Sequence, residues 1–231
     1  MYKRVLLKLS GEALAGASGT GIDPATVDRV VNQLVELSKQ KVQIGIVVGG
    51  GNFWRGRQGV AMNKVTADHM GMLATIMNSL ALQDAIEKKG VHTRVQTALS
   101  IPEVAEPFIL RKALHHFECG RVVIFACGTG NPYFTTDSGA ALRAAEIKAD
   151  VILMAKNVDG VYDSDPKTNR NAKKFDKLTY MDVINKNIAV MDFTSVTMCM
   201  ENKIPIVAFG LAEENSIIRA ASGEKIGTII C

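Results

Sequence analysis

The 231-residue sequence lacks several features that mark specialised classes of protein. Its four cysteines, Cys119, Cys127, Cys199 and Cys231, form no Cys-x-x-Cys pair, which argues against a zinc or redox site. No apolar run approaches the roughly 20 residues of a membrane span. The start, MYKRVLLKLSGE, is too short and too charged for a signal peptide. We therefore expect a soluble cytoplasmic protein with reduced thiols and no membrane contact.

The sequence also has only a small excess of positive over negative charge. The chain has 27 basic and 23 acidic residues, a net charge of +4, and no long Lys/Arg run, so we expect no nucleic-acid groove. The four histidines, His69, His92, His115 and His116, show no metal-type spacing with carboxylates, and we expect them at the surface or at helix ends. Length and composition are those of one globular α/β domain over residues 1–231.

Short apolar runs alternate with helical patterns along the whole chain. The runs predict buried strands at 4–9, 42–48, 92–97, 121–126, 150–155, 204–209 and 226–230. Apolar spacing predicts helices at 24–37, 66–89, 102–117, 137–148, 179–185, 193–202 and 213–221, the first of them capped by Asp23. This order predicts a mostly parallel sheet covered by helices on both faces. Residues 157–178 form one long stretch without a helix, which is typical of a functional or mobile segment.

Glycine turns and cations follow several of the predicted strands. KLSG, GGGNFWRG, CGTGNPYFTTDSG and KNVDGVYDSDP come after four of the runs and contribute Lys8, Arg55 and Lys156. Ligands bind where parallel strands end, and glycines let backbone N–H groups approach an anion. GTGNPYFTTD is therefore either a phosphate cradle or a plain turn with Asp137 as helix N-cap. Lys8 is either a paired cation at the strand end or a strand-edge lysine that reaches solvent. Trp54 could stack on a base or simply pack.

Two common nucleotide motifs are absent. The chain has no G-x-x-x-x-G-K-[ST] loop and no G-x-G-x-x-G that opens the first helix, so a P-loop kinase is excluded and a dehydrogenase is disfavoured.

Five segments together carry a family resemblance. They are KLSGEAL at 8–14, GGGNFWRG at 49–56, DHMGMLATIMN at 68–78, GTGNPYFTTDSGAALRAAEI at 128–147 and KNVDGVYDSDP at 156–166. In this order they closely resemble the bacterial uridylate kinases (UMP kinases), a branch of the amino acid kinase superfamily, from Tyr2 to Ile230. The resemblance implies an α/β fold, a three-layer αβα sandwich around a mostly parallel sheet. It also implies transfer of the γ-phosphoryl group of ATP to UMP. A homohexamer, activation by GTP, inhibition by UTP and Mg²⁺ held mainly by phosphates and water are further implications.

The resemblance assigns roles to individual residues. Lys8, Arg55 and Asp137 would be catalytic, with Asp137 orienting Lys8 and no protein ligand for a metal. ATP would contact Lys8, Leu9, Ser10, Gly11, Gly51, Arg55, Lys156, Asn157, Tyr162 and Asp165. UMP would contact Gly50, Asp68, Thr129, Gly130, Asn131, Pro132, Tyr133, Phe134, Thr135 and Thr136. The segment linked to GTP would be Gly16, Ala17, Ser18, Gly19, Thr20 and Gly21.

Some alternatives stay open within this assignment. Some relatives have a lysine at the position of Asn157, so either Lys156 or Asn157 would touch ATP. We interpret Gly50 and Gly51 as glycines that lack a side chain because a phosphate group is expected against the backbone on either side of them. An amino acid kinase that makes an acyl phosphate and a catalytically silent nucleotide sensor are the rival functions.

Overall fold

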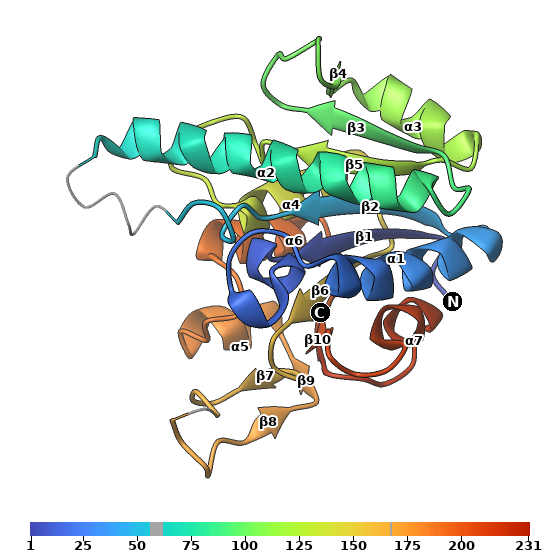
Figure 1. Ribbon diagram of the computed structural model, residues 1–231. Coiled ribbons are helices and arrows are strands. Elements are labelled where there is room, and N and C mark those ends of the chain that lie inside the picture. Colours follow the sequence, from blue (N-terminus) through green and yellow to red (C-terminus); the bar gives the residue numbers. More distant parts are fainter. Residues whose placement is uncertain (56–61, 167) are drawn as a thin grey trace.

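The computed structural model describes residues 1–55, 62–166 and 168–231, so Gly56, the last residue of the GGGNFWRG motif, lies outside the described residues. A nine-stranded sheet runs through its centre in the order β4-β3-β5-β2-β1-β6-β10-β11-β9 (Figure 1). All neighbouring strands are parallel except β10 and β11. The strands are β1 Arg4–Leu9, β2 Gln43–Val48, β3 Thr93–Thr97, β4 Glu106–Pro107, β5 Val122–Ala126, β6 Val151–Lys156, β9 Lys177–Leu178, β10 Ile206–Gly210 and β11 Thr228–Ile230.

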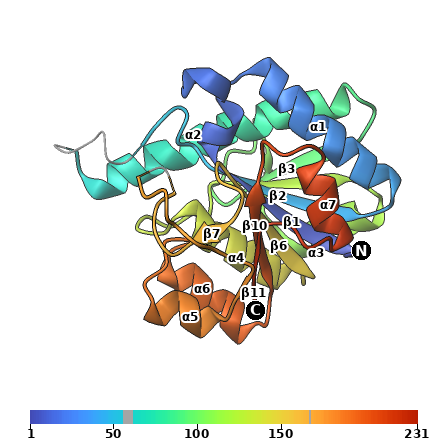
Figure 2. The same ribbon diagram turned by 90° about the horizontal axis from the view of Figure 1, so that it is seen from below.

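Helices cover both faces of the sheet, which confirms the predicted α/β sandwich (Figure 2). On one face lie α1 Pro24–Lys39, α2 Lys64–Glu87 and α7 Ser216–Ser222. On the other lie α3 Leu110–Glu118, α4 Thr136–Glu146, α5 Tyr180–Asn185 and α6 Phe193–Glu201. Asp23 caps α1 as predicted, since its side chain accepts from the N–H of Thr26. None of the helices in the described ranges is long and apolar enough to cross a membrane.

The alternation of side chains along β1 directs Lys8 to one particular face. Val5, Leu7 and Leu9 pack into the core on the side of α1 and α2, whereas Leu6 packs into the core on the side of α4. Successive side chains of a strand point to opposite faces, so Lys8 shares the face of Leu6. The alternation along the strand therefore directs the Lys8 side chain to the face of the sheet that α4 covers.

The predicted helix at 102–117 is too long. α3 begins only at Leu110, and Glu106–Pro107 instead form the edge strand β4 beside Thr97 of β3. Proline lacks an N–H and clashes with the preceding helical turn, whereas an edge strand tolerates it. The last helix also begins later than predicted, at Ser216, because Asn215 adopts a left-handed conformation.

The stretch 157–178 has no helix in its described part, but it is more ordered than the sequence suggested. β7 Val161–Tyr162 and β8 Lys174–Phe175 pair antiparallel and extend away from the main sheet as a hairpin (Figure 1). β9 then joins the sheet beside β11.

Candidate active site

The glycine-containing turns meet around β1. β2 pairs with β1 on one side, with Lys8 opposite Val47, and β6 pairs on the other, with Lys8 opposite Met154. The strands from β2 to β5 lie on one side of β1, and the strands from β6 onward that belong to this sheet lie on its other side. The carboxyl end of β1 is therefore a topological switch point, where α/β proteins bind ligands. The turns after β1, β2, β5 and β6 therefore share one edge of the sheet.

Lys8 and Asp137 form an ion pair at this edge. The Lys8 Nζ lies 2.5 Å from Asp137 Oδ1, and the two side chains are only 12% and 18% exposed. Thr135, not Asp137, caps α4, because the Thr135 hydroxyl accepts from the N–H groups of Asp137 and Ser138. Asp137 in the first turn of α4 is thus directed at Lys8, and Lys8 does not extend freely into solvent.

Lys156, at the end of β6, adds a second cation to this pair. Its Nζ donates to the carbonyl of Val190 at 2.5 Å. Burial, together with repulsion from Lys8, lowers the pKa of Lys156, and attraction to Asp137 opposes this shift only in part. Lys8 pairs with Asp137, and Lys156 lies near enough to both groups for their charges to affect its pKa, so lysine side chains gather where an anion could approach.

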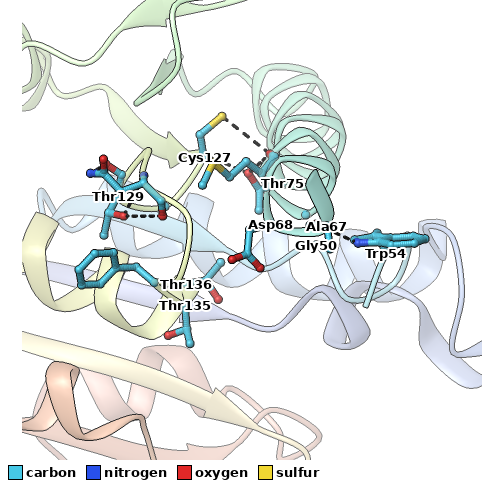
Figure 3. A pocket seen from close by; sticks show the side chains of 14 residues that line it. Gly50, Trp54, Ala67, Asp68, Thr75, Cys127, Thr129, Thr135 and Thr136 are labelled. Atoms are coloured by element: carbon cyan, nitrogen blue, oxygen red, sulfur yellow. Dashed lines mark hydrogen bonds between the residues drawn. The ribbon is translucent and has the colours of Figure 1, made fainter. Parts of the chain in front are cut away.

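A first cleft, of about 550 Å³ including its open side, lies between α2 and the loop that leads into α4 (Figure 3). Seven of the ten residues predicted to contact UMP line it: Gly50, Asp68, Thr129, Asn131, Phe134, Thr135 and Thr136. Gly130, Pro132 and Tyr133 are not among its lining residues. Six residues without an individual UMP assignment also line the cleft: Ala67, Gly71, Met72, Thr75, Cys127 and Gly128.

Asp68 projects from α2 toward the loop that carries Thr135 and Thr136 (Figure 3). Its carboxylate accepts from Lys64 Nζ at 2.6 Å and from the backbone N–H of Tyr133 at 2.8 Å. Burial raises the pKa of Asp68, but these two donors outweigh it and leave the pKa below its ordinary value. An ionised carboxylate therefore faces the first cleft, where it can only accept hydrogen bonds.

Trp54 lines the first cleft and also contacts the start of α2. Its Nε1–H donates to the carbonyl of Ala67 at 3.0 Å, which fixes the indole at the mouth of the cleft (Figure 3).

A second cleft, of about 950 Å³, lies between the β7–β8 hairpin and residues 186–190. Lys156, Tyr162 and Asp165, all predicted to contact ATP, line it, whereas Asn157 is exposed and is not on its wall. The Tyr162 hydroxyl donates to Asp159 Oδ1 at 2.6 Å. The sequence did not indicate the opposite wall, Lys186 to Val190, because those residues follow α5 and carry no motif.

Protein packing accounts for one of the two glycines that the sequence interpretation placed beside phosphates. A Cβ on Gly50 would lie 2.7 Å from the Cβ of Ala74 and 2.8 Å from the carbonyl of Gly71, so α2 packs directly against it. A Cβ on Gly51 would meet only Glu12, at 3.6 Å. Neither glycine has a positive φ. The close approach of α2 thus explains Gly50, and protein sterics do not explain Gly51.

A buried pair of amides holds the GGGN turn. Asn52 and Asn78 each donate to the other's side-chain oxygen, at 2.9 and 2.7 Å, and both are almost fully buried. Asn78 also donates to the carbonyl of Gly49, and Asn52 to that of Gly21, both at 2.7 Å. The pair therefore joins the turn to α2 and to the segment 16–21, which is mostly exposed and contains the short 3₁₀ helix η2 Gly16–Ser18. No sequence pattern indicated this pairing.

Arg55 lies at the end of the same turn. Its guanidinium contacts Glu12 Oε1 at 2.7 Å, and its Nε–H donates to the carbonyl of Gly51 at 3.3 Å. Glu12 belongs to the 3₁₀ helix η1 Gly11–Leu14, which follows β1 and is capped by Ser10.

Asp192 ties the start of α4 to α6. It caps α6 by accepting from the N–H of Ser195 at 2.9 Å. It also accepts from the hydroxyl of Thr135 and, at 3.1 Å, from that of Ser138. Burial raises the pKa of Asp192, but these hydrogen bonds lower it by more, so the pKa lies below its ordinary value.

His116 lies in the last turn of α3, as predicted for the histidines, but its side chain is buried. His116 is 6% exposed, and its Nε2 lies 3.0 Å from Glu106 Oε2, with Arg121 on the other ring nitrogen at 3.1 Å. Glu106 reaches His116 because it lies on the edge strand β4. The sequence pattern predicted a helix there and therefore did not indicate this contact. Within residues 1–55, 62–166 and 168–231 no group of three or more His, Cys, Asp or Glu side chains is placed to hold a metal ion.

Comparisons with known proteins agree with this geometry. A model of the amino acid kinase family matches residues 3–210. The structure of a UMP kinase from Bacillus anthracis is 40% identical with a TM-score of 0.95, over 99% of this chain and 96% of that one. A UMP kinase from Ureaplasma parvum is 39% identical with a TM-score of 0.93, over 100% and 99%. A uridylate kinase from Archaeoglobus fulgidus is 28% identical with a TM-score of 0.74, over 98% and 99%. The chain belongs to the amino acid kinase family.

Proposed function

We propose that the chain is a UMP kinase that transfers the γ-phosphoryl group of ATP to UMP, giving ADP and UDP. The observation that carries the proposal is the Lys8–Asp137 pair at 2.5 Å, placed between two clefts. Asp137 follows Thr136 on the wall of the first cleft and lies close enough to Lys156, on the wall of the second, to affect its pKa. The likeness to two UMP kinases at about 40% identity over nearly the whole chain supports UMP as the acceptor.

The chemistry asks little of the protein beyond position and charge. The attacking atom is an oxygen of the UMP phosphate, which is already anionic at neutral pH, so no general base is required. The difficulty lies in aligning two polyanions and neutralising the charge of the group in transfer. Lys8, Lys156 and Arg55 supply cations for this task, and Asp137 fixes Lys8.

In this proposal UMP occupies the first cleft. The carboxylate of Asp68 accepts hydrogen bonds from ribose hydroxyls, and Thr129, Thr135 and Thr136 contact the phosphate and base. ATP occupies the second cleft, with adenosine beside Tyr162 and Asp165 and its phosphates reaching Lys156 and the KLSG turn.

Mg²⁺ would be held mainly by phosphate oxygens and water. It prefers an octahedral shell of oxygens, whereas Asp137 is already paired with Lys8 and Glu12 with Arg55. When bound, the ion would supply further neutralisation of the phosphate charge.

Assembly into a homohexamer belongs to the same proposal. Leu73, Met77 and Leu80 form an exposed apolar stripe along α2, with 50%, 50% and 36% of their surface accessible. A contiguous apolar stripe of this kind favours a protein contact. Light scattering of the purified protein tests the hexamer, and a monomer at micromolar concentration would contradict it.

Activation by GTP and inhibition by UTP complete the proposal. The hydrogen bonds between Gly21 and Asn52 connect the segment 16–21 to the GGGN turn, so a change in that segment can reach Gly50. Initial rates with and without GTP and UTP test the two effects, and unchanged rates would contradict them.

A coupled assay of ADP release tests the main proposal. The protein is given ATP and Mg²⁺ with UMP, CMP, N-acetylglutamate or no acceptor. We expect fast release with UMP alone. Release with N-acetylglutamate would indicate an amino acid kinase, and no release with any acceptor would indicate a nucleotide sensor.

A further inference from the structure

Glu12 connects the two turns that flank the proposed phosphate path. It lies in η1, directly after Gly11 of the KLSG turn, and its carboxylate contacts Arg55 at the end of the GGGN turn at 2.7 Å. The same side chain packs on the turn itself, since its Oε1 and Cγ lie 3.6 and 3.8 Å from where a Cβ of Gly51 would be. Arg55 in turn donates to the Gly51 carbonyl at 3.3 Å. Glu12, Gly51 and Arg55 thus form one contact group.

Folding stability does not explain this ion pair. The side chains of Arg55 and Glu12 are 50% and 41% exposed, and ion pairs with that exposure contribute little to stability. The Glu12 carboxylate also repels a phosphate that approaches Arg55, so by charge alone it weakens phosphate binding. Its structural effect is to restrict the Arg55 guanidinium, because Glu12 and the Gly51 carbonyl contact two of the guanidinium nitrogen atoms.

We propose that Glu12 is a positioning residue for phosphoryl transfer, which orients the guanidinium of Arg55 against Gly51. This inference rests on the proposed UMP kinase function. A planar guanidinium binds phosphate oxygens in pairs only when its plane is correctly turned. Glu12 therefore acts through Arg55, and its effect belongs to the chemical step more than to nucleotide binding.

Two variants separate orientation from charge. Glu12→Gln keeps the length and one hydrogen-bond acceptor for Arg55, whereas Glu12→Ala removes the contact. We expect Glu12→Ala to lower kcat about 10- to 100-fold, the scale on which misplacement of a catalytic group acts. Glu12→Gln should recover a large part of that loss. KM for UMP and ATP should change less than kcat, and the urea midpoint should stay unchanged. Asp84→Ala, which breaks the exposed pair with Lys88, is the matched control and should behave as wild type.

A double-mutant cycle tests whether Glu12 acts through Arg55. In an Arg55→Ala background, Glu12→Ala should have no further effect on kcat. Trp54, the single tryptophan, precedes Arg55 and borders the first cleft, so its emission reports UMP binding in every variant. We expect equal UMP titration curves for wild type and Glu12→Ala.

Three results would overturn the positioning role. They are a kcat for Glu12→Ala within twofold of wild type, an undiminished effect in the Arg55→Ala background, or a loss of activity that parallels a loss of stability. Wild-type turnover of UMP is the separate check on the proposed function. A wild-type protein that turns over no UMP would remove both, whereas an active wild type with active Glu12 variants would remove only the inference.

Discussion

Replacement of Asp192 by alanine should loosen the start of α4 and weaken UMP binding. The carboxylate makes two kinds of contact: it caps α6 through Ser195, and it accepts from the hydroxyls of Thr135 and Ser138 on α4. Loss of an N-cap costs about 1 kcal/mol. Each hydrogen bond to a charged group contributes about 1.5–3 kcal/mol. With the cap and both hydroxyl hydrogen bonds lost, we expect the free energy of unfolding to fall by about 4–7 kcal/mol, which is a large part of a typical total of about 5–15 kcal/mol.

Asp23→Ala is the matched control for this variant. Asp23 is also an aspartate N-cap, on α1, and its carboxylate accepts from the N–H and the hydroxyl of Thr26, within the helix that it caps. Its loss should cost about 1–2 kcal/mol in urea unfolding and leave the UMP KM unchanged. Asp192→Ala should raise the UMP KM more than the ATP KM, because Thr135 lines the first cleft. Equal unfolding costs for the two variants, with an unchanged UMP KM, would show that Asp192 is a helix cap and nothing more.

The lowered pKa of Asp192 predicts a dependence on pH with a definite sign. A carboxyl group with a lower pKa in the folded state stabilises the fold above its ordinary pKa, and this contribution disappears as the pH falls through the lowered value. The difference in unfolding free energy between wild type and Asp192→Asn should therefore shrink as the solution is acidified below the ordinary carboxyl pKa. A difference that grew with acid would refute the reasoning.

Three further substitutions test other parts of the site. Arg55→Ala should lower turnover by about 10²–10³ in a steady-state assay without loss of the fold, and a near-normal kcat would contradict its role. Asp68→Asn should mainly raise the UMP KM, and a change confined to the ATP KM would reverse the assignment of the two clefts. Asn78→Ala leaves the side-chain oxygen of Asn52 and the carbonyl of Gly49 without a donor. It should cost about 2–4 kcal/mol in urea unfolding, and a cost below about 1 kcal/mol would mean that these groups find other partners.

Local patterns in the sequence were sufficient for most of the elements, but not for β4, the start of α3 or the β7–β8 hairpin. β1 begins and ends where its apolar run does, and Asp23 caps α1 as its position before Pro24 indicated. These features depend on neighbours a few residues apart, whose periodicity reflects backbone geometry directly. The glycine turns after four strands also indicated an anion site at the sheet edge, whereas only the family resemblance indicated UMP.

The tertiary structure decided which other residues meet. The family resemblance had already assigned Asp137 to orient Lys8, whereas the Asn52–Asn78 pair and the exclusion of a side chain at Gly50 by α2 follow only from the strand order and from the packing of helices across the sheet. Such contacts join residues distant in the chain, and no local period encodes them. The sequence by itself determined that glycines and a cation stand at the end of β2. The fold determined that Gly50 is bare because of a helix and that Arg55 is held by Glu12.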